Sequence, residues 1–243
     1  MKEREIYADL RCVSPVILRV DGRNFQHTLK KEGFEKPYDL FFATCMADSI
    51  ELFFKKSNMN PVFAYTFSDE ASIVFTDLPF DRRVEKLDSV VPSFLSSSFT
   101  LFSGIEEPVA FDCRVIPVCS GQFTEYMQWR QQEAWRNFVS SYGYYTLIDE
   151  GIDRKSAASI MHGKKSQDIH EMMFERGTNL AKKPAWQRRG VAVYRVKYPI
   201  EGYNPLLEEK TRSTRSRIYQ DWDLPLFSTA EGDNFLKRHI SLD

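Results

Sequence analysis

The chain has 243 residues, of which 42% are hydrophobic and 28% are charged, and its formal net charge is −1. These values describe a globular protein of one large domain, or of one and a half. No apolar run approaches 18 residues and the first residues are charged, so we expect no membrane partner, no secretion signal and a cytoplasmic location. Four cysteines without CxxC or zinc spacing indicate reduced thiols, and four histidines offer no metal-ligand cluster.

The first 118 residues alternate between strand and helix patterns. Residues 15–21 have the period of a half-buried strand, with Asp21 on the more polar face. The later elements expected are a helix that starts at Lys36–Pro37, strands at 62–67 and 71–75, a helix at 81–102 and a strand at 109–117. The order β-α-β-β-α-β is the ferredoxin-like pattern of an α+β fold. Both helices are expected on one sheet face, which leaves a charged face that carries Arg19, Asp21, Asp112 and Arg114.

The second half contains helical and strand patterns and many cations. The elements expected are helices at 122–142, 153–161 and 166–175, and strands at 190–198 and 214–222 around a loop at 202–205. The polar segment 210–217 indicates an exposed arm. Residues 163–217 hold 13 Lys and Arg against 6 Asp and Glu, a net charge of +7, which leaves −8 for the remainder. This asymmetry fits an acidic catalytic body with a basic surface for a polyanion, or a solvated charged face.

Two acidic residues stand at the ends of strand-like runs. Asp21 lies in Arg-Val-Asp-Gly-Arg and Asp69 in Phe-Ser-Asp-Glu, and the order of the elements brings them together from neighbouring strands. Two carboxylates placed in this way hold two Mg²⁺ ions for in-line phosphoryl or nucleotidyl transfer. Asp-Gly and Ser-Asp are also ordinary turn signals, and the first motif taken alone favours a turn.

Five motifs follow one another in a fixed order. They are Arg19–Phe25, Gly33–Asp39, Phe67–Ser72, Phe111–Arg114 and Trp129–Gln131. Together they resemble the tRNA-His guanylyltransferase superfamily, whose enzymes add nucleotides in the 3′–5′ direction. The resemblance implies a polymerase-like catalytic palm at residues 1–120. It also implies a tRNA-binding region of helices and a β-hairpin arm, packed on the palm, at residues 121–243.

The same resemblance assigns roles to residues. Asp21 and Asp69 match the two metal-binding aspartates, Gly22 matches a carbonyl ligand, and Glu70 matches a supporting catalytic acid. The implied contacts to ATP, GTP or another nucleoside triphosphate are Asp21, Gly22, Arg23, Asn24, Phe25, Gln26, Lys36, Ser68 and Asp69. Gln26 stands where many members have His. A lysine at a helix start and the amides after Gly22 also favour a polyphosphate on physical grounds.

One stretch departs from the eukaryotic pattern. After Trp-Arg-Gln, eukaryotic members carry a His-Ile-Asn-Asn-type stretch associated with reading the His anticodon, whereas residues 135–138 here are Trp-Arg-Asn-Phe. The chain is therefore more similar to archaeal and bacterial guanylyltransferase-like proteins, which are template-dependent and repair tRNAs that lack 5′ nucleotides. The residues expected to bind tRNA are Arg136, Lys164, Lys165, Arg188, Arg189, Arg212, Arg215 and Arg217. A homo-oligomer, either a dimer or a tetramer, is also expected.

Three alternatives remain open at this point. One is a guanylyltransferase that adds the extra 5′ G to tRNA-His. Another is a two-metal nucleotide cyclase, although no Gly-Gly-Asp-Glu-Phe turn is present. The third is a non-catalytic RNA-binding module on a ferredoxin-like scaffold, which is disfavoured because the first strand ends in acid where RNA binding would need an aromatic residue.

Overall fold

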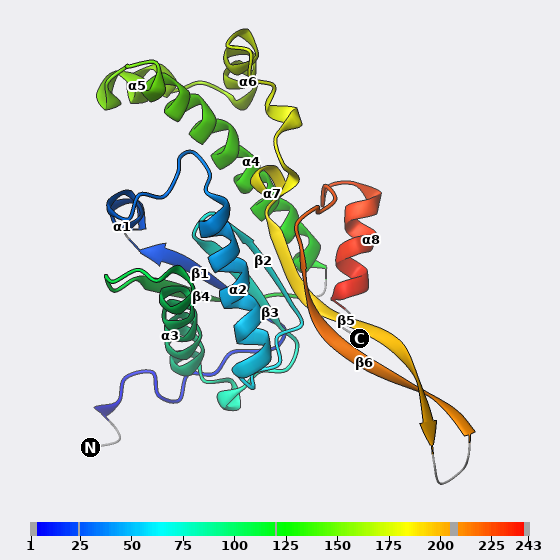
Figure 1. Ribbon diagram of the computed structural model, residues 1–243. Helices are drawn as coiled ribbons and strands as arrows, with labels where there is room; N and C mark the ends of the chain where they lie inside the picture. The colour runs from blue at the N-terminus through cyan, green and yellow to red at the C-terminus, as the bar shows by residue number, and fades with distance from the viewer. Residues whose placement is uncertain (1–3, 24, 120, 205–208, 241–243) are drawn as a thin grey trace.

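The computed structural model describes residues 4–23, 25–119, 121–204 and 209–240 (Figure 1). Its centre is a six-stranded antiparallel sheet in the order β4-β1-β3-β2-β5-β6. The first half comprises β1 (Val16–Arg23), α1 (Phe25–Lys31), α2 (Leu40–Lys56), β2 (Phe63–Phe67), β3 (Glu70–Phe75), α3 (Val84–Ser103) and β4 (Ala110–Pro117). The second half comprises α4 (Gln122–Asp149), α5 (Arg154–Met161), α6 (Ser166–Glu175), α7 (Ala185–Arg189), β5 (Val191–Asn204), β6 (Glu209–Asp221) and α8 (Ala230–His239). The predicted α+β fold with a ferredoxin-like strand order is confirmed.

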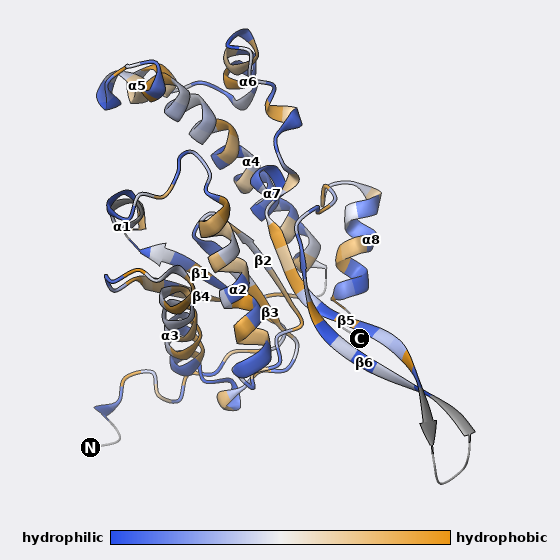
Figure 2. Ribbon diagram, in the orientation of Figure 1, coloured by the Kyte–Doolittle hydropathy of each residue, from blue (hydrophilic) through white to orange (hydrophobic). Residues whose placement is uncertain are grey.

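One face of the sheet packs against α2 and α3, as the sequence predicts. The alternation in β1 sends Val16, Leu18 and Val20 to this side, where they join a fully buried cluster with Phe53 and Leu87 from the two helices. Figure 2 shows the apolar residues gathered in the sheet and along α2, while the part of β5 and β6 that projects from the body is mostly hydrophilic. This layer fixes the positions of β1, β2 and β3 and therefore the geometry at their ends.

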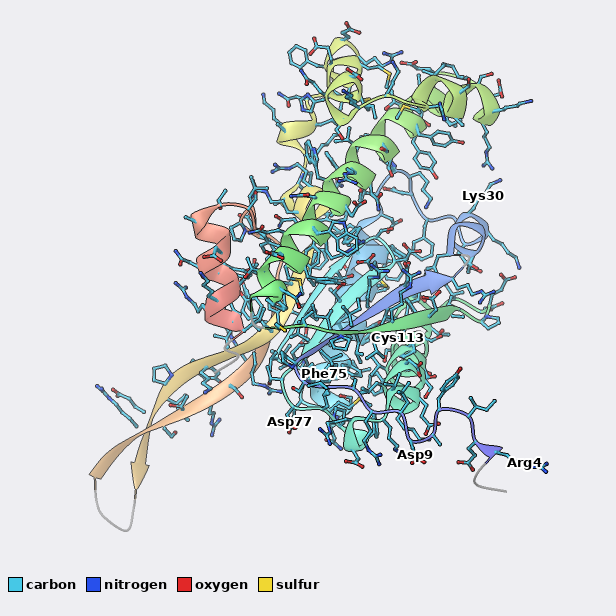
Figure 3. All side chains as sticks on the ribbon, turned by 180° about the vertical axis from the view of Figure 1, so that it is seen from behind. Arg4, Asp9, Lys30, Phe75, Asp77 and Cys113 are labelled. Carbon is cyan, nitrogen blue, oxygen red and sulfur yellow. The ribbon has the colours of Figure 1, made fainter. Side chains whose placement is uncertain are left out.

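The opposite face is only partly open, in contrast to the open face expected. The beginning of α4, together with α8 and the segment before it, covers the apolar part of this face through residues such as Phe123, Met127, Phe227 and Leu236. Figure 3, seen from behind, shows α4 crossing the sheet beside β1 and β4, the strand that carries Cys113. The uncovered part of the face is its charged end, towards the carboxyl end of β1.

The second half continues the sheet of the first half. Phe63–Thr66 of β2 pair with Val191–Tyr194 of β5. Strands from both halves of the chain therefore belong to one sheet. Beyond these pairs, β5 and β6 continue as a twisted hairpin that projects from the body (Figure 1). The hairpin strands extend through residues 202–204 of the predicted loop, whereas residue 205 lies outside the described part of the chain.

Several element boundaries differ from the predictions. Lys36–Pro37 does not begin a helix; α2 begins at Leu40, because the Asp39 carboxylate caps it by accepting a hydrogen bond from the Phe42 amide at 2.8 Å. The short helix α1 was not predicted. Within the described residues, no helix is both long and apolar enough to cross a membrane.

Candidate active site

A row of three acidic residues crosses the uncovered end of the sheet. Asp112 on β4, Asp21 on β1 and Glu70 on β3 occupy directly opposite positions, so their side chains share one face. The next row on that face contains Arg114 and Arg19. The acidic end of the sheet therefore borders a cationic strip, and the strip separates it from the apolar area under α4.

Asp69 joins this row from the turn between β2 and β3. The Gly22 amide donates to the Asp69 carbonyl at 2.9 Å, which ties the turn to β1. A Cβ on Gly22 would lie 2.9 Å from Asp69 Oδ2 and 2.7 Å from the Phe25 ring, so only glycine leaves this space for the carboxylate. Ser68 Oγ donates to Asp69 Oδ1 at 2.9 Å and orients it. Burial, and then the charge of Asp21, raise the pKa of Asp69.

These donors fit a pair of Mg²⁺ ions. The carboxylates of Asp21 on β1 and Asp69 in the β2–β3 turn are hard oxygen ligands of the kind that Mg²⁺ prefers. A cation bound by the two carboxylates would oppose the rise in the pKa of Asp69 that burial and the charge of Asp21 cause. Within the described ranges, no group of three or more His, Cys, Asp or Glu side chains is arranged to hold a metal ion by itself.

A cavity of about 320 Å³ opens beside Asp69. Its lining includes Phe34, Lys36, Tyr38, Asp39, Phe42, Ser68, Asp69, Asn137, Ser141 and Trp186. Burial lowers the pKa of Lys36, and the negative charges of Asp69 and Asp39 oppose this effect. A cation, two carboxylates and aromatic walls in one cavity suit a ligand that combines a planar ring with phosphates.

The second half of the chain supplies cavity residues that sequence reasoning missed. Asn137 and Ser141 stand four residues apart on α4, and Trp186 on α7 stacks edge-on against Tyr38 with ring centroids 6.0 Å apart. Two polar residues at this spacing on one helix face were the available signal. The sequence did not indicate that α4 would direct them to the first half.

The expected site residues are only partly brought together. Lys36, Ser68 and Asp69 line the cavity, and Gly22 and Asp21 lie beside Asp69 on β1 without lining it. Phe25 is buried behind Gly22 and packs against aromatic rings. Arg23 is exposed at the end of β1. Asn24 and the side chain of Gln26 lie outside what the structure describes.

Glu70 forms a buried ion pair with Arg130 of α4. Its carboxylate accepts hydrogen bonds from Arg130 Nε at 2.8 Å and from Arg130 Nη2, and both side chains are 9% exposed. Arg130 also lies over the ring of Trp129, at 4.4 Å from the centroid. Burial raises the pKa of Glu70, and Arg130 opposes that effect. The pair links β3 to α4, so it holds the helix against the floor of the site.

The cations expected to bind tRNA do not form one patch. They lie on α4 (Arg136), between α5 and α6 (Lys164, Lys165), on α7 (Arg188, Arg189) and on β6 (Arg212, Arg215, Arg217). Figure 1 shows α5 and α6 at one end of the molecule and the hairpin at the other. Arg136 is exposed and pairs with Glu133 at 2.7 Å.

The comparisons with known proteins decide the family. The model described as tRNAHis guanylyltransferase matches residues 1–119, and the Thg1 C-terminal domain matches residues 121–222. A probable tRNA(His) guanylyltransferase of Drosophila melanogaster is 30% identical over 220 residues, which cover 85% of this chain and 73% of the relative. The chain belongs to the tRNAHis guanylyltransferase family. Membership confirms both the resemblance inferred from the five motifs and the predicted enzyme class, a nucleotidyltransferase.

Other members of the family extend the similarity over the whole chain. The probable tRNA(His) guanylyltransferase of Homo sapiens is 28% identical over 260 residues, covering 97% of this chain and 85% of the relative. A bacterial tRNA(His) guanylyltransferase-like protein, solved in complex with GTP, superposes with a TM-score of 0.77 at 23% identity, covering 99% of this chain and 97% of that one. The tRNA(His) guanylyltransferase of Saccharomyces cerevisiae superposes with a TM-score of 0.66, also at 23% identity, over 75% of this chain and 87% of that one. These structures share the fold.

Proposed function

We propose that the protein adds nucleotides in the 3′–5′ direction to the 5′ end of tRNA, selected by the opposing strand, and so repairs 5′-truncated tRNAs. The observation that carries the proposal is that Lys36 and Asp69 line one cavity with aromatic walls, with Asp21 close to Asp69, in a chain of this family. Residues 1–120 form the catalytic palm in this proposal, and residues 121–243 hold the tRNA. That the protein forms a homo-oligomer and that it is located in the cytoplasm remain predictions from the sequence.

In this proposal one group of residues binds the nucleoside triphosphate and another binds the 5′ end of the RNA. The cavity beside Asp69 takes a nucleoside triphosphate, ATP for activation or the incoming NTP. Its aromatic walls contact the base, and Lys36 with the amides after Gly22 contacts the phosphates. Two bound Mg²⁺ ions would neutralise charge at the attacked phosphate and activate the 3′-hydroxyl. Glu70 is the positioning residue that sets Arg130 and α4 against β3.

The RNA 5′ end is the electrophile in this proposal. The 3′-hydroxyl of the incoming nucleotide loses its proton to solvent and attacks the activated 5′ phosphate. This forms a phosphodiester bond and displaces AMP from an adenylylated end or pyrophosphate from a triphosphate end, so the RNA end has to lie in line above the acidic row. Arg19 and Arg114 border that row. A cationic strip beside two carboxylates that would bind metal fits the phosphates of a nucleic acid.

The identity of the added nucleotide tests the proposal directly. With a tRNA that lacks its 5′ nucleotide, changing the opposing base from C to A is expected to switch the preferred substrate from GTP to UTP, because base pairing selects the nucleotide. Incorporation of each labelled NTP with Mg²⁺ measures the preference. The alternative function, addition of the extra 5′ G to tRNA-His, is favoured by the names of the relatives. Addition of G to tRNA-His alone, whatever base opposes it, would establish that alternative.

The hairpin offers a surface for the tRNA body. Tyr219, Arg217, Tyr198 and Arg215 lie on one face of the paired strands, and Arg217 lies 6.0 Å over both tyrosine rings. Arg212 lies opposite Glu201 in the strand register. It is three residues from Arg215, an odd number, so its side chain lies on the opposite face of the hairpin. Alternating cations and aromatic rings on an exposed ribbon fit a phosphate backbone. We propose the face with Arg215 and Arg217 as the principal contact to the tRNA body.

The salt dependence of binding tests this surface. The double variant Arg215→Ala/Arg217→Ala is expected to weaken tRNA binding and to reduce the slope of log Kd against log salt by about two, since each phosphate contact contributes about one. Affinity for GTP should not change. Lys237→Ala removes an exposed cation from α8 and serves as the control. Equal slopes for the double variant and the wild type would show that this face is only solvated.

A further inference from the structure

A second cavity, of about 360 Å³, lies between α4, α7 and the segment before α8. Gln128, Gln131, Gln132 and Trp135 line it from α4, Arg188 and Arg189 line it from α7, and Leu226 and Ser228 line it from the segment before α8. The α4 residues are spaced by three and four, so they share one helix face. This cavity shares no lining residue with the cavity beside Asp69.

The two arginines of this cavity have unused donors. Arg188 Nε donates to the Lys183 carbonyl at 2.7 Å, and Arg189 Nη1 donates to the Leu224 carbonyl at 2.8 Å. Neither forms an ion pair within the described part of the chain, although a guanidinium carries five N–H groups. Partial burial, and then the charge of Arg189, lower the pKa of Arg188, while Asp223 opposes both. Two adjacent cations without a paired carboxylate are stabilised by an anion that accepts from both.

Trp135 provides an aromatic wall at the same place. Its indole stacks on the fully buried Phe138 ring, with centroids 5.3 Å apart and planes 28° from parallel, so the orientation of the indole is fixed. The rest of the half-buried indole borders the cavity. The exposed Gln132 amide makes no hydrogen bond to other described residues, and it is free to pair with a base edge.

We infer that this second cavity binds one unstacked nucleotide of the RNA substrate, with its base on Trp135 and its phosphate on Arg188 and Arg189. The inference rests on the proposed function for the presence of RNA. A base and a phosphate could equally come from a free nucleotide. An RNA strand fits better, because two guanidinium groups balance one or two phosphodiesters and a triphosphate carries about four negative charges. The site therefore gives the protein a contact to single-stranded RNA apart from the acidic row.

Binding without nucleotide triphosphates tests this inference separately from catalysis. The probes are a short single-stranded RNA, a blunt RNA duplex and free AMP. Trp135→Leu is expected to weaken binding of the single strand about 5- to 150-fold, the range for loss of one base–aromatic stack, and to leave the duplex unaffected. Arg188→Gln should weaken the same probe. Trp135→Phe, which retains a ring, should restore most of the affinity and thereby exclude misfolding. Arg154→Gln on α5 is the matched surface control.

The outcomes separate the possibilities. Equal affinity of wild type and Trp135→Leu for all three probes would overturn the inference, even if base-directed nucleotide addition is observed. Competition by AMP, together with an unchanged affinity for the single strand in Trp135→Leu, would also overturn it, because the pocket would then belong to a free nucleotide. Loss of single-strand binding in a protein that adds no nucleotide would support the pocket while contradicting the proposed function.

Discussion

Replacing Asp21 or Asp69 by Asn is expected to reduce the rate of nucleotide addition by at least about 1,000-fold, with little change in tRNA affinity. Asparagine keeps the size of the side chain and removes the negative charge. In the proposed site the two carboxylates would hold the Mg²⁺ ions between β1 and the β2–β3 turn, whereas the predicted tRNA contacts lie on other elements. Single-turnover incorporation of a labelled NTP measures the first effect, and filter binding of tRNA measures the second.

The acidic row provides a matched control for this experiment. Asp112 lies directly opposite Asp21 on β4, is exposed, and shares the same face of the sheet. Because it is not next to the β2–β3 turn, Asp112→Asn is expected to retain nearly all activity. A loss in Asp112→Asn as large as that in Asp69→Asn would mean that the negative charge of the whole row matters. Near-normal turnover in Asp21→Asn or Asp69→Asn would contradict the two-metal assignment.

The strands and helices of the first half of the chain can be predicted from the sequence, because the patterns that specify them are local. The period of two in β1 and the helical apolar stripe of α2 each arise within a few residues, and they were sufficient for the β-α-β-β-α-β order. The carboxylates at the strand ends followed from that order. The sequence pattern predicts the start of α2 too early, because a proline such as Pro37 is common in the first turn of a helix. The side chain of Asp39 caps the helix and determines that it begins at Leu40.

The remaining features depend on contacts between distant segments. Pairing of β2 with β5 joins residues more than a hundred positions apart, and no local period encodes it. The position of α4 over the sheet directs Asn137 into the first cavity and Trp135 into the second, although the two residues are nearly adjacent in sequence. The charge asymmetry suggested one basic surface, but the fold places its cations at opposite ends of the molecule (Figure 1).

The Glu70–Arg130 ion pair is another contact of this kind, and removing one partner is expected to have the largest effect on stability. Arg130→Met should lower the free energy of unfolding by about 3–5 kcal/mol, because the Glu70 carboxylate then stays buried without a partner. The double variant Glu70→Gln/Arg130→Met removes both charges and should recover much of that loss. Urea denaturation followed by circular dichroism gives the three values.

A second arginine on the same helix distinguishes burial from charge. Arg136 pairs with Glu133 on α4, but its side chain is 59% exposed, so Arg136→Met should cost only about 0.2–1 kcal/mol. If Arg130→Met costs no more than Arg136→Met, the buried pair does not hold α4 against β3. In that case Glu70 would be free to act with Asp21 and Asp69, and Glu70→Gln should slow nucleotide addition without destabilising the fold. A large stability loss together with recovery in the double variant assigns Glu70 to positioning α4 beside the acidic row.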